Sequence, residues 1–301
     1  MTGGLLGGIE AGGTKFVAVV GTGPDDIRHR LRVDTTTPDQ TLDAVVEFFL
    51  RNRVASIGIA SFGPVELRAD HPAYGHITTT PKPGWQDADL IGPISDALDV
   101  PVAIETDVTG AALGEWRWGA GRGLDNFIYV TVGTGIGGGA LIRGRPVPGL
   151  VHSEMGHVSV ERQAGDSFPG GCPFHGDCLE GMASGPAIEA RWGRPAHGLG
   201  ADTAHGVDLE ARYLAAGFRN LVYVLAPQRI VLGGGVAKMP GLVAAVGEYL
   251  VDAMQGYAVL DAHRRGFVVR PGLGDDAGSA GALALAELAG GKSPEWRDHQ
   301  S

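Results

Sequence analysis

Cysteine is scarce in this chain of 301 residues, which has only Cys172 and Cys178, so a scaffold built on several disulfides is excluded. Charged residues are few, at 19%, and acidic ones prevail, giving a net charge of −10. No stripe of lysine or arginine could neutralise nucleic-acid phosphates, and the densest basic run, Arg28–Arg32, is explained by a solvated strand edge. We therefore expect no nucleic-acid partner.

Long apolar runs are also absent, since no stretch of about 18 apolar residues occurs, and we expect no membrane span. The N-terminus lacks the basic segment and the cleavable apolar stretch of a secretory signal. We expect a cytoplasmic protein, in which thiols stay reduced. The polar tail, Lys292–Ser301, is expected to be frayed.

Glycine, by contrast, is abundant: 50 residues, well above the usual share of about 7%. Short apolar segments rich in β-branched residues alternate with amphipathic segments of helical length, a pattern typical of α/β proteins. Strands are predicted at 5–9, 16–20, 57–60, 102–104, 127–132, 230–232 and 267–269, and helices at 41–51, 87–98, 209–225, 242–255 and 278–288.

Two similar glycine turns, Gly7–Lys15 and Thr131–Gly139, each precede an apolar strand, which indicates two related halves. We predict one α/β lobe over residues 1–118 and a larger one over 119–277, and the last helix, 278–290, can complete the first lobe. A third cluster, Gly233–Gly235, lies between a strand and a helix. Each cluster alone fits a tight turn, but three together favour nucleotide phosphates bound by backbone N–H groups. No Walker A motif is present.

Both cysteines lie in one segment, Cys172-Pro-Phe-His175-Gly-Asp-Cys178, fifteen residues after His157. Two thiolates and two imidazoles form a ligand set that Zn²⁺ binds tetrahedrally. A disulfide between the cysteines is the alternative, but it leaves His175 unexplained. Because four protein ligands leave no open position, the zinc would be structural, and it would fix the loop that carries Glu154.

Asp107 follows the predicted strand 102–104, at the end where open α/β sheets place ligands. It could accept a proton from a hydroxyl group, or it could cap the helix that starts near Gly110. The residues alone leave both readings open.

Taken together, these motifs resemble the ROK family of sugar kinases over nearly the whole chain. The start Glu10-Ala-Gly-Gly-Thr-Lys15 and the Cys-Pro-Phe-His spacing resemble its fructokinase branch more than its glucokinases. The resemblance implies a two-lobed actin-like ATPase fold of the ribonuclease H-like type, with ATP and sugar in the cleft between lobes, usually in a homodimer.

The resemblance also implies roles for individual residues. Asp107 would be the catalytic base, and zinc would bind His157, Cys172, His175 and Cys178. The sugar would contact Gly63, Glu105, Thr106, Asp107, Glu154 and His157. ATP, carried with Mg²⁺, would contact Glu10, Gly12, Gly13, Thr14, Lys15, Thr131, Gly133, Thr134, Gly135, Gly233, Gly234 and Gly235.

Two positions depart from the family pattern: Glu10 stands where many members have Asp, and Thr109 where many have Asn. The expected reaction is transfer from ATP to fructose, giving fructose 6-phosphate, with mannose, glucose or an N-acetylated hexosamine as alternative acceptors. A non-catalytic sugar sensor is the alternative from another class, although its helix-turn-helix segment has no counterpart before Glu10. An ATPase scaffold would need neither Glu154 nor the zinc segment.

Overall fold

The computed structural model describes residues 4–147, 149–257 and 266–291, so the tail Lys292–Ser301 lies outside them. Contacts divide the chain into two compact units. Unit 1 comprises residues 1–123, 143–152 and 272–301, and unit 2 comprises 124–142 and 153–271. The predicted division differs in three segments, because 119–123, Arg143–His152 and 272–277 all join unit 1. Among the described residues, no helix combines the length and the apolar character needed to cross a membrane.

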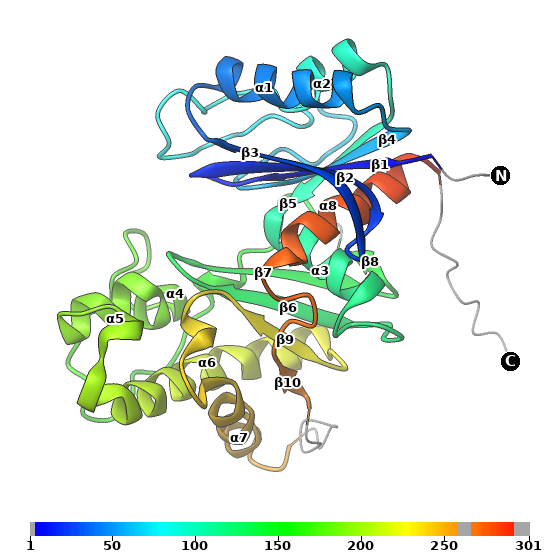
Figure 1. Cartoon of the computed structure of the whole chain (residues 1–301). Helices are drawn as coiled ribbons and strands as arrows, with labels where there is room; N and C mark the ends of the chain where they lie inside the picture. The colour runs from blue at the N-terminus through cyan, green and yellow to red at the C-terminus, as the bar shows by residue number, and fades with distance from the viewer. Residues whose placement is uncertain (1–3, 148, 258–265, 292–301) are drawn as a thin grey trace, which may run out of the picture. The chain divides into compact units, whose positions relative to one another are not determined.

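Unit 1 is built on a five-stranded sheet of order β3-β2-β1-β4-β5, covered by helices on both faces (Figure 1). Strand β3 is the edge strand, as the basic run in it predicts, and β5 forms the other edge. Helices α1 and α2 lie over one face, and α3 and α8 over the other. The elements are β1 (Leu6–Ala11), β2 (Lys15–Gly23), β3 (Asp26–Asp34), α1 (Pro38–Arg51), β4 (Ser56–Ser61), α2 (Gly92–Leu98), β5 (Val102–Thr106), α3 (Asp107–Trp118) and α8 (Ala277–Ala289).

The second sheet repeats this topology, with the strand order β10-β9-β6-β7-β8, and its strands β6, β7, β9 and β10 belong to unit 2. In each sheet the first strand pairs antiparallel with the second and parallel with the fourth, so the predicted likeness of the two halves is confirmed. The elements are β6 (Phe127–Val132), β7 (Ile136–Ile142), β8 (Arg145–Pro146), α4 (Leu179–Ala183), α5 (Gly185–Trp192), α6 (Thr203–Leu225), β9 (Ile230–Gly233), α7 (Leu242–Met254) and β10 (Val268–Val269). Single 3₁₀ turns span Met155–His157, Ala196–Gly198, Gly200–Asp202, Val236–Lys238 and Gly274–Asp276.

Many glycines serve helix packing instead of ligand approach. A Cβ atom on Gly58 of β4 would lie 2.5 Å from Leu285 Cβ of α8, and one on Gly114 of α3 would lie 2.7 Å from the backbone nitrogen of Gly281. The backbones of α3, α8 and the sheet can therefore approach closely. Part of the high glycine content thus has a purely structural cause.

Glu115, fully buried on α3, holds two chain segments together. One carboxyl oxygen accepts hydrogen bonds from the backbone N–H groups of Ala120 (2.6 Å) and Gly272 (2.9 Å), and the other accepts one from Leu273 (2.9 Å). Ala120 lies just before the chain leaves unit 1 after Gly123, and Gly272 is where it returns. A single side chain therefore satisfies three donors at two of the four crossings between units.

We expect Glu115→Ala to lower the free energy of unfolding by about 3–5 kcal/mol, because three backbone N–H groups lose a charged acceptor. Glu115→Gln should cost about 1–3 kcal/mol, since its amide nitrogen would face a donor. Urea unfolding measures both, with the exposed Glu47→Gln on α1 as control. An unchanged midpoint for Glu115→Ala would contradict this role.

Candidate functional site

The carboxyl ends of three parallel strands form one edge of the unit 1 sheet. In the pairing of β1, β4 and β5, Ala11 lies beside Ser61, and Ser61 lies beside Thr106. The residues that follow these strands, Gly12, Gly63 and Asp107 among them, therefore share this edge. Ligands bind at such an edge in open α/β sheets. The structure thus brings together the sequence-predicted residues of unit 1.

Asp107 is the first residue of α3, and the cap of this helix is Thr106, so the alternative in which Asp107 serves as the cap is wrong. The Thr106 hydroxyl accepts a hydrogen bond from the Thr109 backbone N–H (3.2 Å) and donates one to the Thr109 hydroxyl (2.9 Å). Both threonines are buried. The hydroxyls of Thr106 and Thr109 are thus engaged with each other, whereas Asp107 is left at the helix start.

The carboxylate of Asp107 is reachable by solvent, but the protein around it still removes enough water to raise its pKa to about 6. A hydrogen bond from the Val108 backbone N–H lowers the pKa, the negative charge of Glu10 raises it, and His152 lowers it. A carboxylate with a pKa near 6 is a stronger base than ordinary aspartate and is still ionised at neutral pH.

Glu105, the second-last residue of β5, is a second carboxyl group with an altered pKa. Burial raises its pKa to about 7, against a lowering hydrogen bond from the Thr106 backbone N–H. Tyr74 lies near enough for Glu105 to raise the tyrosine pKa, after the larger effect of burial. Near neutral pH Glu105 therefore exists in both protonation states, and its protonated form can donate a hydrogen bond to a ligand oxygen.

Glu10 and the turn Gly12–Lys15 complete this edge. The Ser279 hydroxyl, in the first turn of α8, donates to Glu10 Oε2 (3.0 Å), a position where the helix dipole favours a carboxylate. The turn is closed by a hydrogen bond from the Gly12 N–H to the Lys15 carbonyl (3.0 Å). A Cβ atom on Gly13 would meet nothing within 4 Å, so the turn is open to a ligand.

In unit 2 the other two glycine turns lie side by side, because they follow the paired strands β6 and β9. Gly234 has a φ of +89°, and a Cβ atom there would lie 2.6 Å from the Val132 nitrogen, so only glycine fits. Gly133 and Gly235 have open space where a Cβ would stand. These features suit phosphate oxygens held by backbone N–H groups, as an ATP site requires.

Glu180 anchors the first of these turns. Its Oε2 accepts a hydrogen bond from the Ile136 N–H (2.9 Å), and the Gly185 N–H, at the start of α5, donates to the Gly133 carbonyl (2.7 Å). The turn is therefore fixed by contacts within unit 2.

Glu154 and His157 stand at the two ends of one 3₁₀ turn, joined by a hydrogen bond from the His157 N–H to the Glu154 carbonyl (3.0 Å). Met155 and Gly156, between them, are buried against β7, where Met155 packs over Gly138. This burial leaves the side chain of Glu154 exposed and directs His157 to the cysteine segment.

The four predicted metal ligands converge. His157, Cys172, His175 and Cys178 offer ligand atoms that all lie within 4.8 Å of one another. His157 Nδ1 is 3.7 Å from Cys172 Sγ and 3.5 Å from Cys178 Sγ, and His175 Nδ1 is 3.8 Å from Cys172 Sγ. Tetrahedral zinc, with bonds of roughly 2.0–2.3 Å, places its ligands about 3.3–3.8 Å apart. Both cysteines are free, so the alternative disulfide is not formed.

Burial favours a cation at this cluster. Burial raises the pKa of the Cys178 thiol, and the neighbouring Cys172 raises this pKa further. The backbone N–H groups of Gly181 and Glu180 lower the same pKa. Two thiolates side by side in a buried place need positive charge nearby. A zinc ion would supply that charge, so the donor set fits zinc.

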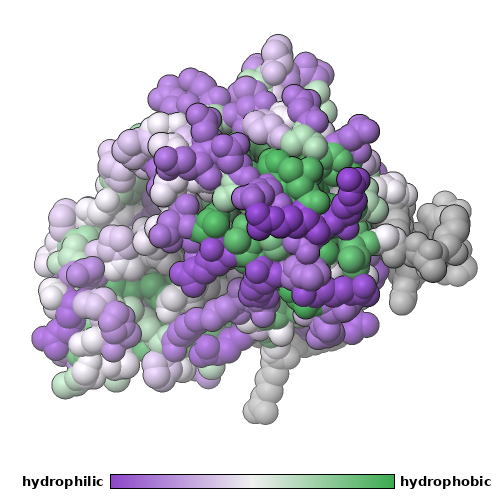
Figure 2. Space-filling model, turned by 45° about the horizontal axis from the view of Figure 1, so that its top comes forward, coloured by the Kyte–Doolittle hydropathy of each residue, from purple (hydrophilic) through white to green (hydrophobic). Residues whose placement is uncertain are grey.

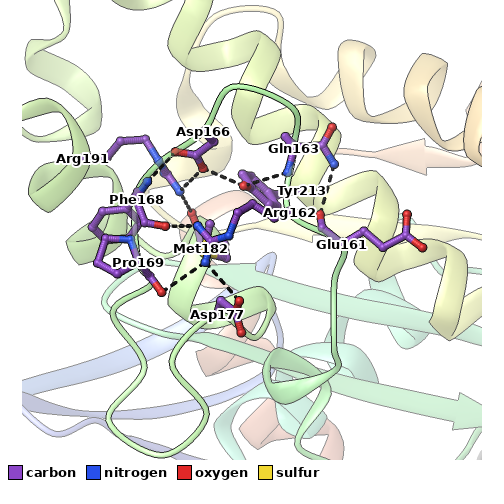
Figure 3. Close-up of polar contacts among 10 residues, drawn as sticks. All are labelled: Glu161, Arg162, Gln163, Asp166, Phe168, Pro169, Asp177, Met182, Arg191 and Tyr213. Atoms are coloured by element: carbon purple, nitrogen blue, oxygen red, sulfur yellow. Dashed lines mark hydrogen bonds and ion pairs between the residues drawn. The ribbon is translucent and has the colours of Figure 1, made fainter.

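A buried ion pair holds the loop that leads into the cysteine segment (Figure 3). Arg191 and Asp166 lie 3.2 Å apart, with side chains only 8% and 6% exposed. Tyr213 donates its hydroxyl to Asp166 (2.6 Å), and Arg191 donates to the Met182 carbonyl (2.9 Å). Burial would raise the pKa of Asp166, but hydrogen bonds from Tyr213 and the Phe168 N–H, together with Arg191, keep it below its usual value. Burial and Asp166 raise the pKa of Tyr213 to about 12. Arg162 links the same loop to Asp177 (3.1 Å).

Comparison with known proteins decides the family. The sequence profile of the ROK family matches residues 6–289. The chain belongs to the ROK family. A fructokinase of Zymomonas mobilis is 44% identical over 296 residues, covering 96% of this chain and 98% of that protein. The predicted resemblance is thus confirmed.

Solved structures of ROK proteins share the fold. A ROK hexokinase from Thermus thermophilus superposes with a TM-score of 0.79 at 30% identity, covering 96% of this chain and 100% of that one. A ROK glucokinase from Streptomyces griseus, in complex with glucose and AMPPNP, gives a TM-score of 0.71 at 26% identity, covering 94% and 99%. The predicted α/β sugar-kinase fold is confirmed.

Sequence reasoning missed several residues that this ROK chain places around the predicted ones. Tyr74 lies by Glu105, His152 acts on Asp107, Ser279 binds Glu10, and Glu180 fixes a glycine turn. Only His152 could have been found from the sequence, because it stands two residues before Glu154, a predicted sugar-binding residue. The others come from distant parts of the chain, where no spacing rule applies.

We expect the purified ROK protein to contain about one zinc per chain, and His175→Ala and Cys178→Ser to lose it. Because four ligands cross-link the segment, both variants should melt more than about 5 °C below the wild type. Elemental analysis and thermal unfolding test this, with the exposed His197→Ala as control. Wild-type protein without zinc, purified without chelator, would contradict the expectation.

Proposed function

We propose that this protein transfers the γ-phosphoryl group of ATP to a hexose, with fructose as the preferred acceptor and fructose 6-phosphate as the product. The observation that carries the proposal is Asp107, a carboxylate with a raised pKa at the ligand-binding edge of a ROK sheet. The identity of 44% with a fructokinase supports fructose.

In the proposed reaction, the oxygen of the sugar hydroxyl forms a bond to the γ-phosphorus, and the bond from that phosphorus to the β–γ bridging oxygen breaks. The hydroxyl proton passes to the Asp107 carboxylate, and ADP leaves. Because phosphoryl transfer has a loose transition state, alignment and charge neutralisation supply most of the rate. Lys15 and the glycine-turn N–H groups would hold the phosphates, and Mg²⁺ enters with ATP.

Sugar recognition is proposed for Gly63, Glu105 and Asp107 of unit 1, where the Thr106 hydroxyl is engaged with Thr109. Sugar contacts of Glu154 and His157 stay predictions of the resemblance. Zinc is proposed as structural: when bound, it supplies a cross-link between His157 and the cysteine segment, and no reaction step. The homodimer stays a prediction of the resemblance, and the cytoplasmic location stays a prediction from the sequence.

A kinase for glucose, mannose or an N-acetylated hexosamine is the second candidate, favoured by the likeness to the Streptomyces griseus glucokinase. Coupled ADP release with Mg-ATP against fructose, glucose, mannose and N-acetylmannosamine separates the two. Activity on fructose alone supports the first proposal. A preference for another sugar would make that sugar the substrate of the same reaction. If no sugar stimulates ADP release, the non-catalytic sugar sensor becomes the favoured function.

Asp107→Asn should lower kcat about 10²–10⁴-fold, because the amide cannot accept the hydroxyl proton. Its shape is nearly that of aspartate, so the thermal midpoint should change little. The coupled ADP assay measures the loss, with the exposed Asp96→Asn on α2 as control. Turnover near that of the wild type would refute Asp107 as the base.

The pH dependence of kcat/KM should follow the ionisation of Asp107. Only the ionised form is a base, so kcat/KM should rise about tenfold per pH unit below a pKa of about 6 and level off above it. Steady-state rates between pH 4.5 and 8, in the range where the protein stays folded, test this. A limb near pH 4, the ordinary range for aspartate, would contradict the proposed environment.

A further inference from the structure

His152 belongs to unit 1, although the next residues, Ser153 and Glu154, belong to unit 2. The segment Arg143–His152 follows β7 and ends at this histidine. Leu150 and Val151, just before it, are 76% and 73% exposed, so these apolar side chains do not anchor the segment. His152 itself is half-buried. Of the residues 150–152, His152 is therefore the one whose side chain the protein partly shields.

Two observations place that imidazole at the edge that carries Asp107. A Cβ atom built on Gly63 would lie 3.7 Å from His152 Nε2, so the ring stands over the backbone just after β4. His152 also acts electrostatically on Asp107, just after β5. Since β4 and β5 are parallel neighbours with Ser61 beside Thr106, the ring lies at the ends of both strands.

We infer that His152 is a sugar-binding residue that holds a hydroxyl of the acceptor beside the hydroxyl from which Asp107 takes a proton. An imidazole suits this task because its two nitrogens can donate to one hydroxyl and accept from another. This inference rests on the proposed function. It adds to the site a residue that lies where the chain passes from unit 1 to unit 2, two residues before Glu154.

The competing account is that His152 only supports the loop at Gly63. A support would affect stability and both substrates alike, whereas a sugar ligand affects the KM for the sugar alone. Removal of a charged side chain next to Asp107 would also shift the acid limb, the pH range in which kcat/KM rises as Asp107 ionises. Glu10 on β1 raises the pKa of Asp107, and His152 opposes it, so removing His152 shifts the limb to higher pH.

The test compares the wild type with His152→Ala and His152→Gln in the full-length protein, by ADP release with fructose and Mg-ATP varied in turn. We expect His152→Ala to raise the KM for fructose at least tenfold and to change the KM for ATP less than twofold. His152→Gln should recover part of the fructose KM through its amide without restoring the acid limb. The exposed His29→Ala on β3 should match the wild type.

An active wild type with an unchanged fructose KM in His152→Ala would overturn the inference and leave the proposed function intact. Equal rises in both KM values, or a large fall in the thermal midpoint of both variants, would assign His152 a structural role instead. If His152→Ala fails to fold, the fructose KM of His152→Gln decides. A wild type without sugar-dependent ADP release would overturn the proposed function itself.

Discussion

The buried carboxyl group of Glu115 is the constraint on which the candidate site of unit 1 depends. It lies two turns beyond Asp107 on α3, and it binds the backbone at Gly272 and Leu273, just before α8. Helix α3 begins with the proposed base, and the first turn of α8 holds Glu10 through Ser279. By joining the end of α3 to the start of the segment leading into α8, one side chain fixes both helix N-termini against the sheet. Loss of the carboxyl would remove the acceptor of three backbone N–H groups that are partly shielded from water.

In unit 2 the same problem of fixing loops is solved by other means. The loop before Cys172 contains few apolar side chains, and a buried ion pair between Arg191 and Asp166, supported by Tyr213, orders it (Figure 3). Beyond it, four metal-ligand side chains converge within 4.8 Å. Apolar side chains pack against the sheet in the interior, whereas hydrophilic residues make up much of the surface seen in Figure 2. Loops of this kind gain little from apolar packing, so specific polar contacts take its place, and the four candidate ligands could add a metal.

Much of this could be predicted from sequence, for stated reasons. Strand β6 matches its prediction over Phe127–Val132, because a continuous β-branched and aromatic run marks a buried strand. Helix α2 was predicted from Asp87 but begins at Gly92, since Asp87 has a φ of +61° and Asp89 accepts the N–H groups of Ile91 and Gly92 in a turn. Helix α1 begins three residues early, at Pro38, where Thr37 caps it. Motifs predicted the four candidate metal ligands that the fold brings together, whereas the contacts of Glu115 and Ser279 depend on tertiary structure that no local pattern indicates.

The two sheets share a topology, yet equivalent strand ends carry different chemistry. Glu10 lies near the end of β1, Glu105 near the end of β5 and Asp107 just after β5, and a glycine turn also follows β1; in unit 2, glycine turns follow β6 and β9. Carboxylates near a triphosphate would repel it, while backbone N–H groups attract it without any charge of their own. Glu180, the carboxyl beside the Gly135 turn, is engaged with the Ile136 N–H. The turns after β6 and β9 are therefore suited to a triphosphate, whereas carboxyl groups gather near the strand ends of unit 1, where Lys15 is the cation in the turn after β1.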